Sequence, residues 1–281
     1  MISFLAIAGQ AGAANIFDLL GKTPSEMPLD LLGTLKSKQY AAVFGESVSA
    51  AELGQLTEAS AASFKHPFTL TNAYYTPKDG SSESESFHTV SFTNGRSSRI
   101  DLTGSDHSQP WAMTVEKQTG LSMQDFEYKT SGSKYNLLEV TLRGRAEKIK
   151  GKIVQVSQYV YYDDSGPVYM VNYTVEEPSV QPAVDSATPE NRITLSCQPD
   201  GTVGSFTISM PGKTPEEVLK LSGIPESDCR KTERKKQEWE GTDSTNWDIE
   251  FTAGPLAGRT GTLFTSTSLK LSSVSIDSAK K

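Results

Sequence analysis

Few residues in this chain have the types and spacing of a catalytic site. His66, His88 and His107 are the only histidines, and they are too widely spaced along the chain to predict a shared metal site. Ser131 and Lys134 have the S-x-x-K spacing of a serine nucleophile and its lysine base, but their glycine-rich, polar neighbourhood is typical of a turn. Because the nucleophile-elbow, zinc-protease, phosphate-loop and dinucleotide patterns are absent, we predict no cofactor and no metal.

Two groups of residues are candidates for binding. Asp106 and His107 lie close to Trp111, and a carboxylate can orient an imidazole that an aromatic ring shelters. Four tyrosines occupy odd-numbered positions of two expected neighbouring strands, where they could form one aromatic face for a sugar ring or a protein partner. Packing in the core or across strands is the alternative explanation for these tyrosines. They are Tyr159, Tyr161, Tyr169 and Tyr173.

The first residues have the features of an export signal. An apolar run over residues 2–9 is followed by Ala11-Gly12-Ala13, which has the small-x-small form of a cleavage site. We therefore expect residues 1–13 to be a signal-like segment and the protein to be periplasmic or extracellular. The run lacks a basic residue in front of it, so a buried N-terminal helix is the alternative. It is also too short to span a membrane, for which about 20 residues are needed.

Composition restricts the function classes. The chain has 281 residues, a formal net charge of −7 and a mean hydropathy of −0.40. Such an acidic balance argues against general nucleic-acid binding, because attraction to phosphates needs clustered positive charge. Abundant serine, threonine and glycine indicate a β-rich protein with many solvated turns.

The elements expected along the chain give an α+β fold of predominantly antiparallel sheets, with a helical N-terminal segment and one packed helix in the C-terminal unit. Residues 15–64 are predicted to be helical, because Thr23-Pro24-Ser25-Glu26 and Ser49-Ala50-Ala51-Glu52 have capping-box spacing. Residues 66–177 then read as strands. Asn94-Gly95 predicts a hairpin turn, and alternating polarity over residues 137–175 predicts an antiparallel meander.

Prolines mark a boundary between two domains. Residues 178–190 contain three prolines and few large apolar side chains, which is typical of an extended linker. We expect one domain over residues 14–177, and a small α+β domain over residues 191–281. In the second domain, Thr214-Pro215-Glu216-Glu217 is a strong helix start between groups of strands.

The second domain contains both cysteines of the chain, Cys197 and Cys229. If the expected helix folds back across the sheet it can bring them together, and export would preserve a bond between them. We therefore predict a disulfide. The sequence as a whole predicts an exported, non-catalytic protein that binds a protein or glycan partner. A secreted hydrolase with a site assembled from distant residues, and an assembly component of a surface structure or virion, are the alternatives.

Overall fold

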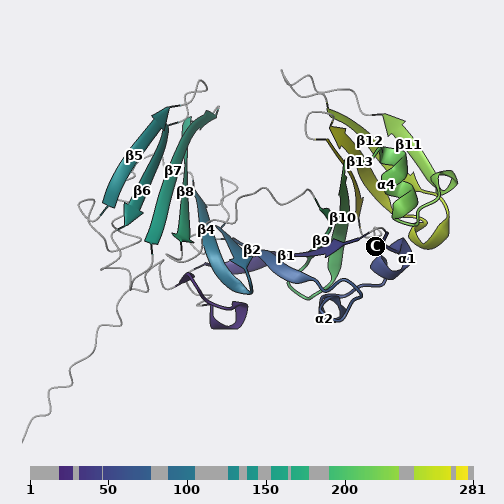
Figure 1. Ribbon diagram of the computed structural model, residues 1–281, viewed down its shortest axis with the longest axis horizontal. Helices are drawn as coiled ribbons and strands as arrows, with labels where there is room; N and C mark the ends of the chain where they lie inside the picture. Colours follow the sequence, from purple (N-terminus) through teal and green to yellow (C-terminus); the bar gives the residue numbers. More distant parts are fainter. Residues whose placement is uncertain are drawn as a thin grey trace, which may run out of the picture. The chain divides into compact units, whose positions relative to one another are not determined.

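The structure is a computed structural model, drawn in Figure 1. It describes the following residues: 19–27, 32–45, 47–76, 88–104, 126–132, 138–144, 153–163, 166–176, 190–233, 244–266 and 270–277. The fold is mostly antiparallel β-sheet with few helices, as the sequence predicts. The chain divides into two compact units: unit 1 is Met1–Thr34 with Tyr75–Val180, and unit 2 is Leu35–Tyr74 with Gln181–Lys281.

The sheet of unit 2 has the strand order β11-β12-β13-β14-β10-β9-β1-β2. The strands are β1 (Thr34–Phe44), β2 (Thr69–Thr76), β9 (Asn191–Cys197), β10 (Val203–Pro211), β11 (Cys229–Glu233), β12 (Ser244–Phe251), β13 (Thr260–Ser266) and β14 (Leu271–Asp277). The first residue of β1 and the last two of β2 belong to unit 1. β1 pairs antiparallel with β9. From β9 to β11 in this strand order, through β10, β14, β13 and β12, each strand is antiparallel to the next.

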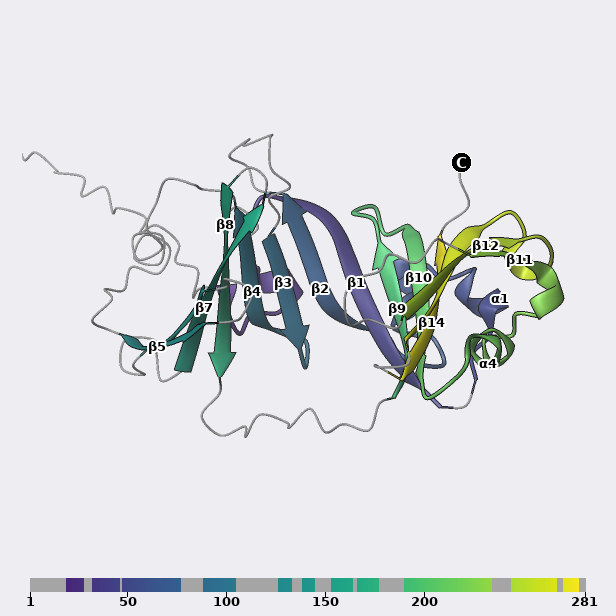
Figure 2. The ribbon, with the colours of Figure 1, turned by 90° about the horizontal axis from the view of Figure 1, so that it is seen from above.

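Short helices complete unit 2: α1 (Ala50–Leu53), α2 (Glu58–Ala61), α4 (Pro215–Leu221), η6 (Glu226–Asp228) and η7 (Gly254–Leu256). The predicted start of α4 is confirmed, because Thr214 is the N-cap residue before Pro215 and forms a capping box with Glu217 in the first turn. Val218 and Leu219 of this helix are buried. Figure 2 shows α1 and α4 on the same side of β9, β10 and β14.

The core of unit 2 lies between that face of the sheet and the helices. Alternate residues of the central strands are buried, as a strand period of two requires. Across the register, Phe206 of β10 is opposite Leu195 of β9 and Ile276 of β14, and all three are almost fully buried. Leu53 of α1 joins the same cluster. The sheet and the helices of unit 2 therefore share one hydrophobic core.

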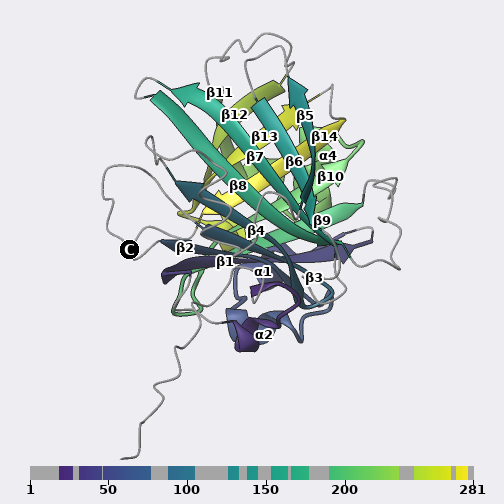
Figure 3. The same ribbon diagram turned by 90° about the vertical axis from the view of Figure 1, so that its left-hand side faces the viewer.

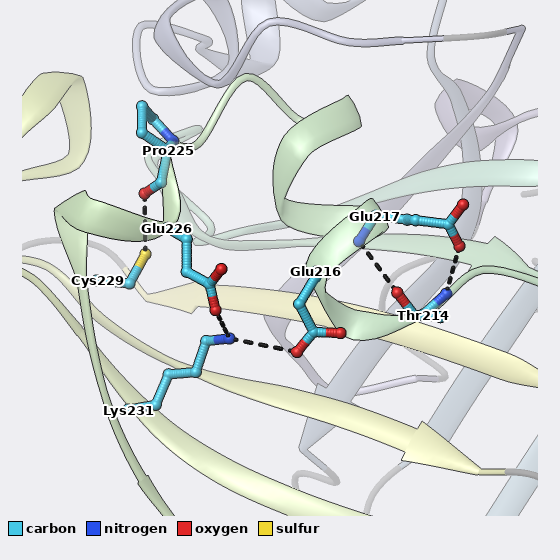
Figure 4. Close-up of polar contacts among 7 residues, drawn as sticks. All are labelled: Thr214, Glu216, Glu217, Pro225, Glu226, Cys229 and Lys231. Atoms are coloured by element: carbon cyan, nitrogen blue, oxygen red, sulfur yellow. Dashed lines mark hydrogen bonds and ion pairs between the residues drawn. The ribbon is translucent and has the colours of Figure 1, made fainter.

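A lysine connects the edge strand β11 to the helices. The ammonium group of Lys231 lies 2.8 Å from a carboxylate oxygen of Glu226 in η6 and 3.5 Å from one of Glu216 in α4 (Figure 4). Partial burial acts to lower the pKa of Lys231, but its two acidic partners outweigh that effect and raise the pKa. Beside this cluster, the thiol of Cys229 donates to the carbonyl of Pro225 at 3.8 Å. These contacts fix β11 to α4 and η6.

Unit 1 has the strand order β3-β4-β8-β7-β6-β5. These strands are β3 (His88–Thr93), β4 (Arg96–Gly104), β5 (Phe126–Gly132), β6 (Leu138–Gly144), β7 (Ile153–Asp163) and β8 (Gly166–Glu176). All their pairings are antiparallel, and Figure 3 shows β6, β7 and β8 side by side. The predicted meander is thus confirmed. The predicted turn is confirmed as well, since Asn94 and Gly95 both have positive φ between β3 and β4.

Residues 19–27 of unit 1 are hydrogen-bonded to the start of β4. The 3₁₀ turn η2 (Pro24–Glu26) begins at the predicted capping box of Thr23 and Glu26. Before it, the amide of Gly21 donates to the carbonyl of Ser97 at 2.8 Å. Leu19 is fully buried in the same region. Backbone hydrogen bonds to β4, and not a long helix, therefore hold this segment in place.

The predicted helical N-terminal segment is not confirmed. Residues 34–44 form β1, in which buried Ala42 and Phe44 flank exposed Val43 at strand period. The predicted helix over residues 50–64 consists of two single-turn helices, α1 and α2. Each begins at a capping side chain, Ser49 or Thr57, so the caps are real but the helices they start are short.

The predicted disulfide is wrong: Cys197 and Cys229 are both free thiols. Four strands separate β9, which ends at Cys197, from β11, which begins at Cys229. At about 4.8 Å between neighbouring strands, the two positions are far beyond the reach of a disulfide along the sheet. The helix α4 does fold back over the sheet, but it returns the chain to the edge strand rather than to β9.

The division into units also differs from the expected domains. Leu35–Tyr74 belongs with the C-terminal strands and not with the meander, because β1 pairs with β9. Residues 1–13 and nearly all of the predicted linker over residues 178–190 lie outside the described residues. No helix in the described part of the chain has both the length and the apolar character needed to cross a membrane.

Candidate functional site

A hollow of unit 2 has a volume of about 1160 Å³. It lies between the short helices α1 and α2 on one side and the turn that joins β9 to β10 on the other, with Arg259 contributing from the segment before β13. Leucine, alanine, proline and valine side chains make up the apolar part of its wall, and Gln55, Thr57, Glu58 and Asp200 are among the polar part. A mostly apolar wall with a few convergent polar groups is the usual form of a ligand site.

Local capping places Glu58 at the wall. Thr57 is the N-cap of α2, and its hydroxyl accepts from the amide of Ser60 at 3.2 Å. Glu58 is therefore the first residue of the helix. Its amide also donates to the carbonyl of Gly201 at 3.2 Å, which ties the start of α2 to the turn between β9 and β10.

The turn itself needs glycine at one position. Gly201 has a φ of 84°, which residues with a Cβ rarely adopt. A Cβ there would also lie 3.3 Å from a carboxylate oxygen of Glu58. The side chain of Asp200 closes the turn by accepting from the amide of Thr202 at 2.9 Å. Glu58 and the turn thus approach closely at one end of the hollow.

The carboxylate of Glu58 is shared by two side chains of β1. The ammonium group of Lys38 lies 2.7 Å from its Oε1 atom, and the hydroxyl of Tyr40 donates to the same oxygen. Lys38 and Tyr40 are two residues apart on one strand, so they lie on the same face of the sheet. We call Lys38, Tyr40 and Glu58 the carboxylate cluster.

The carboxylate cluster changes the acidity of its members. Partial burial acts to raise the pKa of Glu58, but the hydrogen bonds from Lys38 and Tyr40 outweigh it, and the pKa is lowered. Burial, together with the bond to Glu58, raises the pKa of the Tyr40 hydroxyl. At neutral pH Glu58 is therefore ionised and Tyr40 is a neutral donor.

This acidity predicts a pH-dependent contribution to stability. A lowered folded-state pKa stabilises the fold at pH values above the unfolded-state pKa, and the contribution is lost as pH falls through the folded-state value. We expect Glu58→Gln to be less stable than the wild type at pH 7, and the difference to shrink as pH falls below 4.5, the ordinary pKa of a glutamate. Urea denaturation at a series of pH values measures this. Glu52→Gln, at an exposed glutamate of α1, is the control; an equal pH dependence in both variants would contradict the prediction.

Arg259 supplies the cation that lines the hollow. One of its guanidinium nitrogens donates to the carbonyl of Gly54 at 3.1 Å, which positions the side chain beside the end of α1. Together with Lys38, it balances the charges of Glu58 and Asp200. The charged groups of the site thus cancel in sum.

A buried thiol lies on β9, the strand next to Lys38 and Tyr40 of the carboxylate cluster. Cys197 of β9 is paired with Lys38 of β1 in the register and is fully buried. Burial, with a further contribution from the charge of Glu58, raises the pKa of Cys197 to about 11. The thiol is therefore protonated at neutral pH, which makes it a poor nucleophile.

The register of β7 and β8 fixes the positions of the four predicted tyrosines relative to one another. In the register, Tyr159 is opposite Met170 and Tyr169 is opposite Val160. Residues that are opposite each other on neighbouring strands lie on the same face of a sheet. The positions of Tyr159 and Tyr161 are therefore on one face and those of Tyr169 and Tyr173 are on the other, so the four do not share one face. The cause is the turn, which pairs Asp163 with Gly166 and so places odd positions opposite even ones. Whether either pair binds a partner stays a prediction.

The other predicted site, Asp106 with His107 and Trp111, lies outside the described residues. Within the described ranges, no group of three or more histidine, cysteine, aspartate or glutamate side chains is placed to hold a metal ion. The sequence interpretation did not single out the carboxylate cluster. The signal available was the pair Lys38 and Tyr40 at strand spacing, but nothing local indicates that Glu58 meets them.

Comparison of the chain with protein-family models, with curated proteins and with solved structures found no match.

Proposed function

We propose that this protein is a non-catalytic binding protein, and that its ligand is a neutral glycan held in the hollow beside Glu58. The observation that carries the proposal is a largely apolar hollow of about 1160 Å³ that is lined by Tyr40 and Glu58 of the carboxylate cluster. Because the charges of Lys38, Glu58, Asp200 and Arg259 cancel, the site favours a ligand without net charge.

The lining also suits the chemistry of sugars. A pyranose ring has an apolar face of C–H groups and an edge of neighbouring hydroxyls. Tyr40 contributes an aromatic ring to the wall, and aromatic rings combine a large apolar area with a polar end. Gln55 and Arg259 offer donors, while the oxygens of Gln55 and Asp200 accept. Paired donors and acceptors of this kind match a row of hydroxyl groups.

A hydrolytic role has weaker support. Glycoside hydrolysis requires a carboxylic acid with a raised pKa to protonate the leaving group, beside a second carboxylate. Glu58 and Asp200 line the same hollow, but the pKa of Glu58 is shifted downward, and its Oε1 atom is already bonded to Lys38 and Tyr40. The better-placed carboxylate is therefore unsuited to donate a proton. Export, for which residues 1–13 are the support, remains part of the proposal.

Binding to a neutral-glycan array, followed by calorimetric titration of the strongest ligand, tests the proposal. Ala59 is an exposed residue of α2 that lines the hollow, so Ala59→Trp fills the space without altering the core. We expect this change to weaken binding by at least about tenfold, equivalent to about 1.4 kcal/mol. Gln55→Ala should weaken binding by a smaller factor, because it removes polar contacts only.

The matched control is Ala253→Trp, which adds the same side chain at an exposed alanine outside the hollow and should leave the affinity unchanged. The absence of binding to every neutral glycan on the array, or equal binding by Ala59→Trp and the wild type, would contradict the proposal. Release of shorter sugars from the bound ligand would show that the protein is a hydrolase.

A further inference from the structure

A second, smaller hollow of unit 2 has a volume of about 390 Å³ and a different chemical character. Three segments that are distant in sequence form it: residues 47–52, residues 65–66 and residues 220–223. Its polar lining consists of Ser47, Ser49, Glu52, Lys65, His66 and Lys220. None of these residues lines the hollow beside Glu58.

Backbone hydrogen bonds bring the first and third segments together. The amide of Val48 donates to the carbonyl of Leu221 at 3.1 Å, and the amide of Ala50 donates to that of Ser222 at the same distance. Gly223, two residues after the end of α4, has a φ of 67°, so the chain turns away immediately after the contact. Lys220 is thereby held near Ser47 and Ser49.

Aromatic packing places the second segment. The imidazole of His66 lies between two phenylalanine rings, with centroid distances of 6.1 Å to Phe44 and 6.4 Å to Phe64. Phe44 is buried in the core of unit 2, so these contacts connect the ring to a rigid part of the unit. Lys65 precedes it directly in the chain. The positions of both basic residues therefore follow from the core rather than from a free loop.

The two lysines of the lining, Lys65 and Lys220, outnumber its acidic side chains. Both are exposed, and in the part of the chain that the structure describes neither forms an ion pair. Glu52 is the acid of the lining, and it offsets one of the two positive charges. The lining thus retains an excess of positive charge, although the whole chain has a net charge of −7. A local field of this sign attracts anions.

We propose that this second hollow is a binding site for a tetrahedral oxyanion group, a phosphate or a sulfate. Lysine ammonium groups bind such groups as point charges, and serine hydroxyls add hydrogen-bond donors. The hydroxyl of Ser49 already accepts from the amide of Glu52 at 3.4 Å, which leaves its proton available to donate to a ligand. The imidazole of His66 at the wall supplies a ring N–H as a further donor.

The size of the hollow is relevant to whether the bound oxyanion is free phosphate or part of a larger ester. At about 30 Å³ for each water in the liquid, the hollow has room for about a dozen waters, which is more than a single phosphate fills. An ester whose organic part also enters the hollow is therefore compatible with the site. Inorganic phosphate and a phosphomonoester share the recognised group, and titration can separate them.

The test is an NMR titration of the isotope-labelled full chain with inorganic phosphate, inorganic sulfate and glycerol 3-phosphate, each at constant ionic strength. We expect saturable shifts at Ser47, Ser49, Lys65 and Lys220. Lys65→Ala and Lys220→Ala should each weaken binding about threefold, and the double variant about tenfold, because exposed charges are partly screened. Glycerol 3-phosphate binding more tightly than phosphate would identify an ester as the better ligand.

A variant of opposite sign separates a binding effect from a folding effect. Glu52→Gln removes the acid of the lining, so it should strengthen binding about threefold, which a destabilised fold cannot do. Lys213→Ala removes an exposed lysine outside the hollow and should leave binding unchanged. Unchanged binding by the Lys65→Ala/Lys220→Ala double variant, shifts confined to other residues, or no saturable binding of any of the three anions would overturn the proposal.

Discussion

Replacing Phe206 by alanine is expected to lower the free energy of unfolding of unit 2 by about 3–5 kcal/mol. This ring is 1% exposed and lies in the middle of β10, the strand between β9 and β14. Its cross-strand partners Leu195 and Ile276 are fully buried, so the surrounding sheet can collapse little into the space that the ring leaves. The cost therefore includes the lost apolar burial and an unfilled cavity.

Urea denaturation measures this loss, with amide resonances of β9, β10 and β14 as probes that report on unit 2 alone. Val43→Ala is the control, because Val43 is the exposed large apolar residue among those described, at 49%. We expect that variant to differ from the wild type by less than about 0.5 kcal/mol. A loss below 1 kcal/mol for Phe206→Ala would mean that β10 is not the centre of the core.

Adding a single methyl group at Gly261 should also destabilise unit 2 strongly. Gly261 lies in β13, opposite Ile249 of β12 and Ile276 of β14. A Cβ at this position would overlap the carbonyl oxygen of Ser275, a backbone atom that cannot rotate away. Since β14 would have to move away from β13, we expect Gly261→Ala to cost about 3 kcal/mol, at the upper end of the usual range for overpacking.

The control is the same change in open space. Gly45 follows β1, and a Cβ there would meet nothing within 4 Å. Because alanine restricts the unfolded chain more than glycine does, Gly45→Ala should be neutral or stabilising by up to about 1 kcal/mol. Equal stability of Gly261→Ala and Gly45→Ala in urea denaturation would show that β13 and β14 do not approach as closely as described.

The sequence predicts those parts of the fold that depend on local patterns. The strand at Phe206, the helix that begins after Thr214 and the turn at Asn94-Gly95 each follow from alternation, capping or positive φ within a few residues. Capping patterns on both sides of residues 34–44 predict one long helical zone, but these residues form β1. This segment is a strand because it pairs with β9, more than 140 residues later in the sequence, and no local pattern indicates such a distant contact.

The candidate site also depends on contacts between distant segments, so local patterns do not predict it. Tyr40, Glu58 and Gly201 come from a strand, a single-turn helix and a hairpin turn that only the folded sheet brings together. The disulfide prediction assumes that the helix returns the chain close to Cys197, whereas Cys229 begins the edge strand β11, which pairs with β12. Sequence patterns therefore do not predict sites whose residues are brought together by the order of the strands.

The most direct test of the binding proposal is an NMR titration of the isotope-labelled full chain with the strongest neutral glycan from the array. We predict saturable shifts at Gln55, Thr57, Gly201 and Arg259, which line the hollow beside Glu58, and we predict that the Ala59→Trp variant needs a glycan concentration at least about tenfold higher for the same shifts. Shifts confined to the tyrosine positions of β7 and β8, or to Lys65 and Lys220 in the second hollow, would contradict it.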